Sequence, residues 1–534
     1  MLNILKYFSE WTQVRDYGGG SPVTYDQYSL IRASYPVHTL RTGIDWFISP
    51  KQTVGFLFNR TYTNRDGDID AKADIMQIGT LKVESIEEAE SEFKNKYNSQ
   101  MYNINYRISI AEDEELTVDA DYGHVYSNNW QNMQISYLNT DGNVLRLPAE
   151  FQYRGPRSID ILSLKADYMK SFSEITRMEA GLKTGQTITD NEILYENLND
   201  GRWEVDYNQS NNFKYTEQVS AVYATFSHRF GKFSAMAGLR AEYTSIKGES
   251  PTMDTTFSRS YIDWFPSTFL QYQIKDGQSL NLSYSRKINR PGFGLLNPFR
   301  TYIDPFTFFS GNPDLKPSYN NTVSLRYSIN GYSANLSYSF LNDIFEQDYE
   351  QDDETRTMNV TTNNLGKRQG LTLSGYIPIK FAKWYNMQIY AQGMWNMDDT
   401  RHSGERFRND YLTAYTSLQN VFTITSTLRA NIQMIWNKLG WQGIMLFDDI
   451  YSMNAQLEKT FFDKRLSVSI SCNDLFSSTV YRAKVDFANM NQKTKQDNHY
   501  RQIILTARYS FGSQQIRGAR NRSVGIEEEI GRTR

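Results

Sequence analysis

The sequence is poor in several residue types and patterns, and each shortage excludes a class of protein. Cys472 is the single cysteine in 534 residues, which rules out a disulfide scaffold and a thiolate metal cluster. The five histidines lie far apart, so none pairs at a helical metal-ligand spacing. No apolar run approaches the roughly 20 residues that a transmembrane helix needs, which excludes a helical membrane protein.

A strong charge of one sign is also missing. The 57 basic and 60 acidic residues give a formal net charge of −3, and the basic residues are scattered, so we expect no nucleic-acid partner. The sequence contains no nucleophile elbow, phosphate loop, zinc-protease motif or dinucleotide fingerprint. No residue therefore stands out as a nucleophile or base, and we expect neither an enzyme nor a bound cofactor.

What the chain does have is aromatic residues, at 14%, and a repeated alternation of apolar and polar side chains with the period of a β-strand. In residues 162–168, for example, every second side chain is apolar, and residues 503–511 repeat the pattern. Alternation alone does not decide whether the apolar face meets a protein core or lipid.

The turns favour lipid. Short turn sequences recur roughly every 40 to 60 residues, and two strand-like runs joined by a longer polar loop lie between consecutive turns, as in outer-membrane barrels. These turns lie at residues 49–52, 111–115, 171–174, 231–232, 275–278, 330–332, 380–383, 425–427 and 462–464. They imply roughly 19 or 20 strands, and so large a sheet favours closure. We predict an all-β, transmembrane, antiparallel up-and-down β-barrel with short periplasmic turns and long extracellular loops.

The segment from Ser283 to Pro317 joins a strand to a long aromatic loop whose five prolines exclude a helix or a central strand. It resembles a loop of the TonB-dependent receptor class of outer-membrane β-barrel proteins, although Ser318 stands where those proteins usually have Glu. The resemblance implies that the matching residues shape the loop or contact a ligand, and they are Arg290, Pro291, Leu296, Asn297, Pro298, Phe299, Gly311, Asn312, Pro313, Leu315 and Pro317.

Two further segments extend the resemblance. Residues 40–62 are similar to an early hairpin of the same receptors, and Phe511 ends the last strand as the aromatic insertion signal does. We therefore expect a barrel over residues 1–511 and a charged periplasmic tail over 512–534. The resemblance implies about 22 strands and a plug in a full receptor. No TonB box, plug or leading strands are recognised before Leu30, so about 20 of those strands are expected in this chain.

The resemblance implies an outer-membrane receptor that takes up a small ligand, using a plug displaced by the TonB complex. Without that plug, we expect this chain to be inactive in transport. The implied partners are outer-membrane lipid, the barrel-insertion machinery, the TonB complex acting through a missing plug, and a small ligand of unknown identity. Partnership with a lipoprotein lid stays open. The alternatives are a passive channel or truncated relic, and a surface adhesin or structural barrel.

One acidic run resembles the start of a calcium loop. Asp66, Asp68 and Asp70 place carboxylates at alternate positions beside Gly67, but a distal bidentate Glu has no clear candidate. A solvated acidic hairpin tip is the favoured interpretation. We therefore predict no metal site, and these three aspartates are only a weak candidate for calcium.

Overall fold

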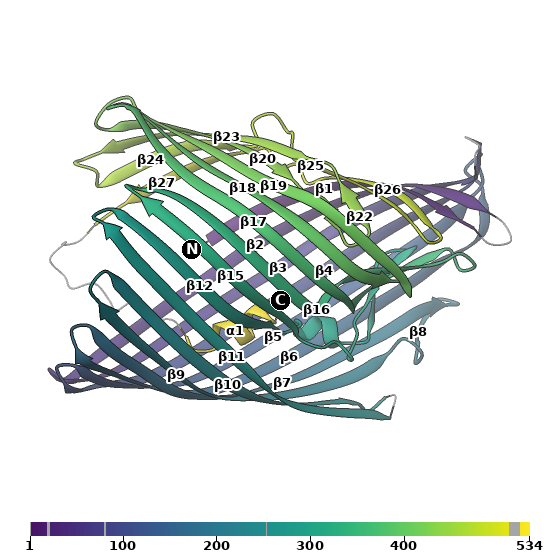
Figure 1. The fold of residues 1–534 in the computed structure, drawn as a ribbon. Coiled ribbons are helices and arrows are strands. Elements are labelled where there is room, and N and C mark those ends of the chain that lie inside the picture. Colours follow the sequence, from purple (N-terminus) through teal and green to yellow (C-terminus); the bar gives the residue numbers. More distant parts are fainter. Residues whose placement is uncertain (1, 19–21, 79–81, 253, 512–523, 534) are drawn as a thin grey trace.

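The computed structural model describes residues 2–18, 22–78, 82–252, 254–511 and 524–533. One sheet of 27 strands forms a barrel of long, tilted strands (Figure 1). Twenty strands make the up-and-down wall, and the other seven, of three to eight residues, lie in the connections at one end of it. The first wall strands are β1 (Leu2–Tyr17), β2 (Val23–Ser49), β3 (Gln52–Gln77), β4 (Val83–Ala111), β5 (Glu114–Leu138), β6 (Val144–Ser173), β7 (Thr176–Asn199), β9 (Asn211–Phe230), β10 (Phe233–Ser250) and β11 (Thr255–Lys275).

The wall continues with β12 (Gln278–Asn289), β15 (Ser318–Ile329), β16 (Tyr332–Asp352), β17 (Thr357–Ala382), β18 (Tyr385–His402), β19 (Glu405–Thr423), β20 (Leu428–Lys438), β23 (Ile450–Phe461), β24 (Leu466–Asn473) and β27 (Gln502–Tyr509). The short strands are β8 (Arg202–Val205), β13 (Arg300–Asp304), β14 (Thr307–Ser310), β21 (Gly440–Gln442), β22 (Met445–Phe447), β25 (Val480–Phe487) and β26 (Met490–Asp497). A 3₁₀ turn, η1 (Phe293–Leu296), and a short helix, α1 (Glu527–Gly531), complete the elements of the described residues.

Each wall strand pairs antiparallel with its neighbour in the chain, which is the up-and-down topology predicted from the turns. The predicted tight turns all fall where two consecutive wall strands meet, whereas the short strands lie in the connections at the opposite end. The fold class is therefore confirmed, with a wall of the expected strand number.

The barrel closes between the first strand and the last hairpin. β1 pairs with β2 along its length, and its residues Glu10–Asp16 pair with Asn491–Asp497 of β26. Nearer the tight-turn end, β27 pairs with β24, and the described residues show no strand on the other edge of β27. Closure in the described chain is thus made by β1 and the short strand β26, in the outer part of the barrel.

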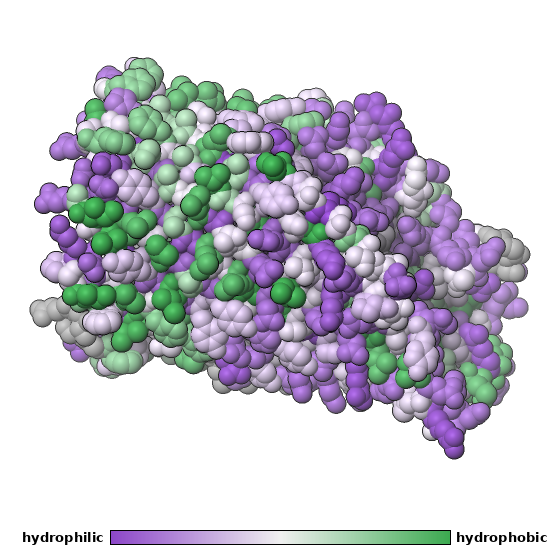
Figure 2. Space-filling view, turned by 90° about the horizontal axis from the view of Figure 1, so that it is seen from below, coloured by the Kyte–Doolittle hydropathy of each residue, from purple (hydrophilic) through white to green (hydrophobic). Residues whose placement is uncertain are grey.

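The two ends of the barrel have different surfaces. The end with the tight turns carries exposed apolar side chains on its outside, such as Leu164, Leu182, Val222 and Leu239, whereas the opposite end is hydrophilic (Figure 2). Such an apolar band fits the hydrocarbon layer of a bilayer. Among the described residues, no helix combines the length and the hydropathy needed to span a membrane.

Candidate functional site in the barrel interior

The loop predicted from the sequence to be functional folds into the barrel. Its apolar side chains Phe293, Leu296, Phe299 and Leu315 are buried, and they belong to the same apolar cluster as Tyr153, Ile161, Tyr195 and Phe213 of the wall. Apolar burial of this kind stabilises the inward position, because each side chain leaves water on packing. The loop motif is therefore brought together inside the barrel.

The Asn-Pro elements of the motif hold the loop backbone in a tight fold. The backbone N–H of Asn312 donates to the carbonyl oxygen of Leu295 at 2.6 Å, and the Asn312 side chain donates to Asn363 Oδ1 at 2.8 Å. A Cβ on Gly311 would lie 2.0 Å from the carbonyl oxygen of Asn297, so only glycine fits this close approach.

The three remaining prolines of the motif lie in the same loop. Pro317 is buried, whereas Pro298 and Pro313 are half-buried. These placements support a loop-shaping role for the motif more directly than a ligand-contacting one.

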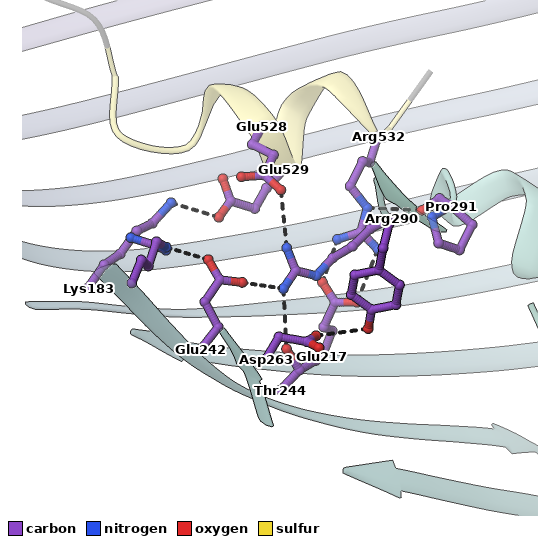
Figure 3. A network of polar contacts seen from close by, with 12 residues as sticks. Lys183, Glu217, Glu242, Thr244, Asp263, Arg290, Pro291, Glu528, Glu529 and Arg532 are labelled. Atoms are coloured by element: carbon purple, nitrogen blue, oxygen red, sulfur yellow. Dashed lines mark hydrogen bonds and ion pairs between the residues drawn. The ribbon is translucent and has the colours of Figure 1, made fainter. Parts of the chain in front are cut away.

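Arg290, the first residue of the motif, is the centre of an ion-pair network. Its Nη2 lies 2.6 Å from Glu242 Oε2 and 3.3 Å from the hydroxyl of Thr244, and its Nη1 lies 3.3 Å from Glu528 Oε1 (Figure 3). Glu242 also contacts Arg240 Nε at 2.5 Å. A buried guanidinium needs such carboxylate partners because an unpaired charge in a protein interior is costly.

Glu528 belongs to the segment Val524–Thr533, which lies inside the barrel (Figure 1). Lys183 Nζ of β7 contacts both Glu529 Oε1 and the carbonyl oxygen of Gly525 at 3.0 Å. Arg532 Nη1 lies 2.5 Å from Glu217 Oε1 of β9, and its Nε donates to the Pro291 carbonyl oxygen at 3.0 Å (Figure 3). The segment is thus bound to the wall and to the loop together.

Apolar contacts accompany these ion pairs. Val524, Ile526 and Ile530 are buried in the same cluster as Phe293 and Leu296 of the loop. Burial alone would lower the pKa of Arg532, but the Glu217 carboxylate outweighs it and holds that pKa above its usual value. Arg532 is therefore a permanent cation facing Glu217.

This position differs from the expected periplasmic tail over 512–534. Residues 512–523 lie outside the described residues, while Val524–Thr533 are inside the barrel. The many charges of the tail suggested a solvated segment, but each of Glu528, Glu529 and Arg532 has a partner of opposite charge in the wall or loop. The apolar Val524, Ile526 and Ile530 were the signal in the sequence that a buried position was available.

The acidic run of the weak calcium candidate lies in a different setting from the one expected. Asp66, Asp68 and Asp70 are in the strand β3, so they form neither a calcium loop nor a hairpin tip. Arg32 of β2 pairs with both Asp68 and Asp70. Within the described ranges, no group of three or more His, Cys, Asp or Glu side chains is arranged to hold a metal ion.

Phe511 follows β27 and is 89% exposed. Its position beside the last strand suits the predicted insertion signal, a role that stays a prediction.

The comparisons agree with this architecture. The sequence profile of the Outer membrane protein beta-barrel family matches residues 109–509. The chain belongs to that family. A barrel of this family lies in the cell outer membrane, in accord with the apolar band of Figure 2. No curated protein sequence matches the chain.

Solved structures share the fold at low sequence identity. The copper transporter OprC is 10% identical with a TM-score of 0.54, and the match covers 93% of this chain and 80% of OprC. The ferric-catecholate import receptor Fiu from E. coli K12 is 9% identical with a TM-score of 0.52, covering 92% and 81%. The unliganded ferric citrate transporter FecA is 9% identical with a TM-score of 0.51, covering 92% and 78%.

Proposed function

We propose that this protein is a receptor-like outer-membrane barrel that binds a small ligand at its outer end and takes part in its uptake. The observation that carries the proposal is the filled interior, where the loop of residues 290–317 and the segment Val524–Thr533 pack together against the wall. A barrel of about twenty strands encloses a lumen wide enough to conduct unless something fills it. The similar structures named above, two transporters and an import receptor, fit this class.

We further propose that Val524–Thr533 closes the lumen at rest. The segment contacts β5, β7 and β9 as well as the loop, so it bridges the interior instead of lying along one strand. Gly525 N–H donates to Asp121 of β5 at 3.1 Å, Lys183 of β7 pairs with Glu529, and Arg532 pairs with Glu217 of β9. Energised uptake would still need the TonB complex and a plug, which the described strands and loops of this chain do not include.

The passive channel and the adhesin predict different behaviour. A passive channel would conduct ions with the interior as described, and an adhesin would attach cells to a surface through its outer loops whether or not the lumen is closed. The buried cluster of loop, wall and segment favours a closed barrel over an open channel, because an open pore leaves its lining in water.

The test is ion conductance in a planar lipid bilayer. We expect the full chain to be silent and a chain ending at residue 523 to conduct in large steps. The matched control is Glu527→Gln, since Glu527 lies in α1 with its side chain exposed and should leave the bilayer silent. Steady conductance of the full chain would support the passive channel instead. Silence of the shortened chain would refute the closing role of the segment.

A further inference from the structure

A cavity of about 220 Å³ lies in the outer half of the barrel, away from the ion-pair network around Arg290. Its wall comes from β1, from the β25–β26 hairpin, from the inward loop strand β14, and from β16, β17 and β22. Apolar side chains include Met358, Val360 and Phe447, and polar ones include Arg15, Gln492 and Thr494. The cavity therefore combines a large apolar surface with one cationic group.

That cation is Arg15, whose side chain is almost completely buried, with the residue 3% exposed. Its Nη1 donates to the Tyr17 hydroxyl at 2.6 Å, and its Nη2 donates to Gln13 Oε1 at 2.8 Å and to the Thr307 hydroxyl at 3.4 Å. The Nε–H is buried without an acceptor. All the partners of this guanidinium are neutral, and no carboxylate of the described chain forms an ion pair with it.

A half-buried arginine elsewhere in the barrel interior shows what is missing. Arg368, also in the outer half, contacts Asp398 at 2.6 Å and Glu346 at 2.7 Å. A buried guanidinium with neutral partners and an unused donor carries a large electrostatic cost, which an anion would relieve. Arg15 is held in place by Tyr17 and Gln13, so its position is fixed before any ligand arrives.

We propose that this cavity binds a small organic anion, with the anionic oxygen group on Arg15 and an apolar body against Met358, Val360 and Phe447. Guanidinium groups bind carboxylate and phosphate oxygens through charge-assisted hydrogen bonds. The amide of Gln492 and the hydroxyl of Thr494 add neutral polar contacts on β26. The inference deepens the proposed function by naming a ligand class, although binding itself requires neither transport nor a closed lumen.

The test uses purified full chain in detergent and isothermal titration with phenylacetate, phenyl phosphate, inorganic phosphate and the neutral 2-phenylethanol. We expect a phenyl anion to bind and phenylethanol to bind at least about tenfold more weakly, the order expected for a hydrogen-bonded charge. Tighter binding of phenylacetate or of phenyl phosphate shows whether the cavity prefers a carboxylate or a phosphate group. Binding of inorganic phosphate as tight as that of phenyl phosphate would overturn the apolar part of the proposal.

Variants separate Arg15 from general folding. Arg15→Gln should lose about tenfold or more in affinity for the anion, Arg15→Lys should lose less, and Arg60→Gln, an exposed wall arginine, should lose nothing. Thermal melts and gel mobility of the unheated barrel verify that each variant is folded. Equal affinity of the wild type for phenylacetate and phenylethanol, no binding of any probe, or unchanged binding by folded Arg15→Gln would each overturn the proposal. A conductance result against the closing segment would leave this test unaffected.

Discussion

Arg290 and Glu242 form an ion pair of 2.6 Å in the barrel interior with 4% and 7% of their side chains exposed. Arg290 is the first residue of the inward loop, and Glu242 lies on β10, so the pair joins the loop to the wall. Glu528 reaches the same guanidinium from the segment Val524–Thr533, but its side chain is 62% exposed. The loop, the wall and the segment therefore meet at one cation.

The pair predicts an asymmetric response to mutation. Glu242→Gln leaves the buried Arg290 with the exposed Glu528 as its remaining ion pair, and we expect a loss of about 3 kcal/mol in unfolding free energy. Arg290→Met should cost less, because Glu242 keeps Arg240 as a partner. Urea unfolding in lipid vesicles measures both. The control is Glu249→Gln on the same strand, whose exposed pair with Lys247 should cost below about 1 kcal/mol. Equal effects of Glu242→Gln and Glu249→Gln would contradict the importance of burial here.

The close approach at Gly311 predicts that a single methyl group displaces the loop. Gly311→Ala places a Cβ against the carbonyl oxygen of Asn297, so the backbone must shift at a cost of about 1–3 kcal/mol. Hydrogen exchange should rise at Leu295, Asn297 and Asn312, whose amides bond within the loop. Gly393→Ala is the control, because nothing lies within 4 Å of a Cβ there. Unchanged exchange in Gly311→Ala would show that the loop tolerates the displacement.

Two exposed leucines of β6 test where the membrane lies. Leu164 is near the tight-turn end and Leu147 is near the outer end of the same strand. Leu164→Arg should destabilise the barrel in lipid by about 2–4 kcal/mol, whereas Leu147→Arg should have an effect near zero, because arginine is costly only within the hydrocarbon. Folding titrations in vesicles measure both losses. A larger loss for Leu147→Arg than for Leu164→Arg would show that the apolar band does not lie at the tight-turn end.

The turn at Asp474 predicts acid sensitivity of the last hairpin. Burial favours the neutral carboxyl, but the backbone N–H groups of Thr479 and Ser478 donate to it and hold the pKa of Asp474 below its usual value. Its stabilising effect is thus fully present above the unfolded pKa of about 3.9 and is lost as pH falls through the lower folded value. Pepsin should cut residues 474–501 faster as pH drops below about 4.

Asp474→Asn supplies the control for that experiment. An asparagine cannot carry the charge, so the cutting rate of the hairpin should be higher than in the wild type at pH 4 and should depend less on pH after correction for pepsin activity. A wild-type rate that follows pepsin activity alone would show that Asp474 does not control the hairpin.

Local patterns predicted the wall well, because a strand between two media must alternate and a short turn must use turn residues. The alternation at residues 162–168 and the turn at residues 275–278 are examples, and both lie where they were expected. The loop was recognised from its prolines and from its resemblance to a receptor loop, whereas the close approach of Gly311 to Asn297 became visible only in the structure.

The interior contacts could not be predicted, because they join residues that lie far apart in the sequence. Arg532 and Glu217 are 315 positions apart, and neither has a neighbour that indicates the other. Arg15 lies in an ordinary alternating strand, and its isolation from carboxylates depends on β14, β25 and β26 arriving from distant parts of the chain. Asp68 and Asp70 resembled a calcium loop in the local sequence, because their partner, Arg32, belongs to the preceding strand.

The length of the wall strands sets how far the barrel stands above the lipid. β6 has 30 residues, which at the usual rise and a tilt near 45° gives a wall of roughly 70 Å, about twice the hydrocarbon thickness. The outer half thus stands in water, and its own interior packing and strand pairing stabilise it. The Arg15 cavity lies in that outer half, so a ligand bound there would sit above the level of the acyl chains.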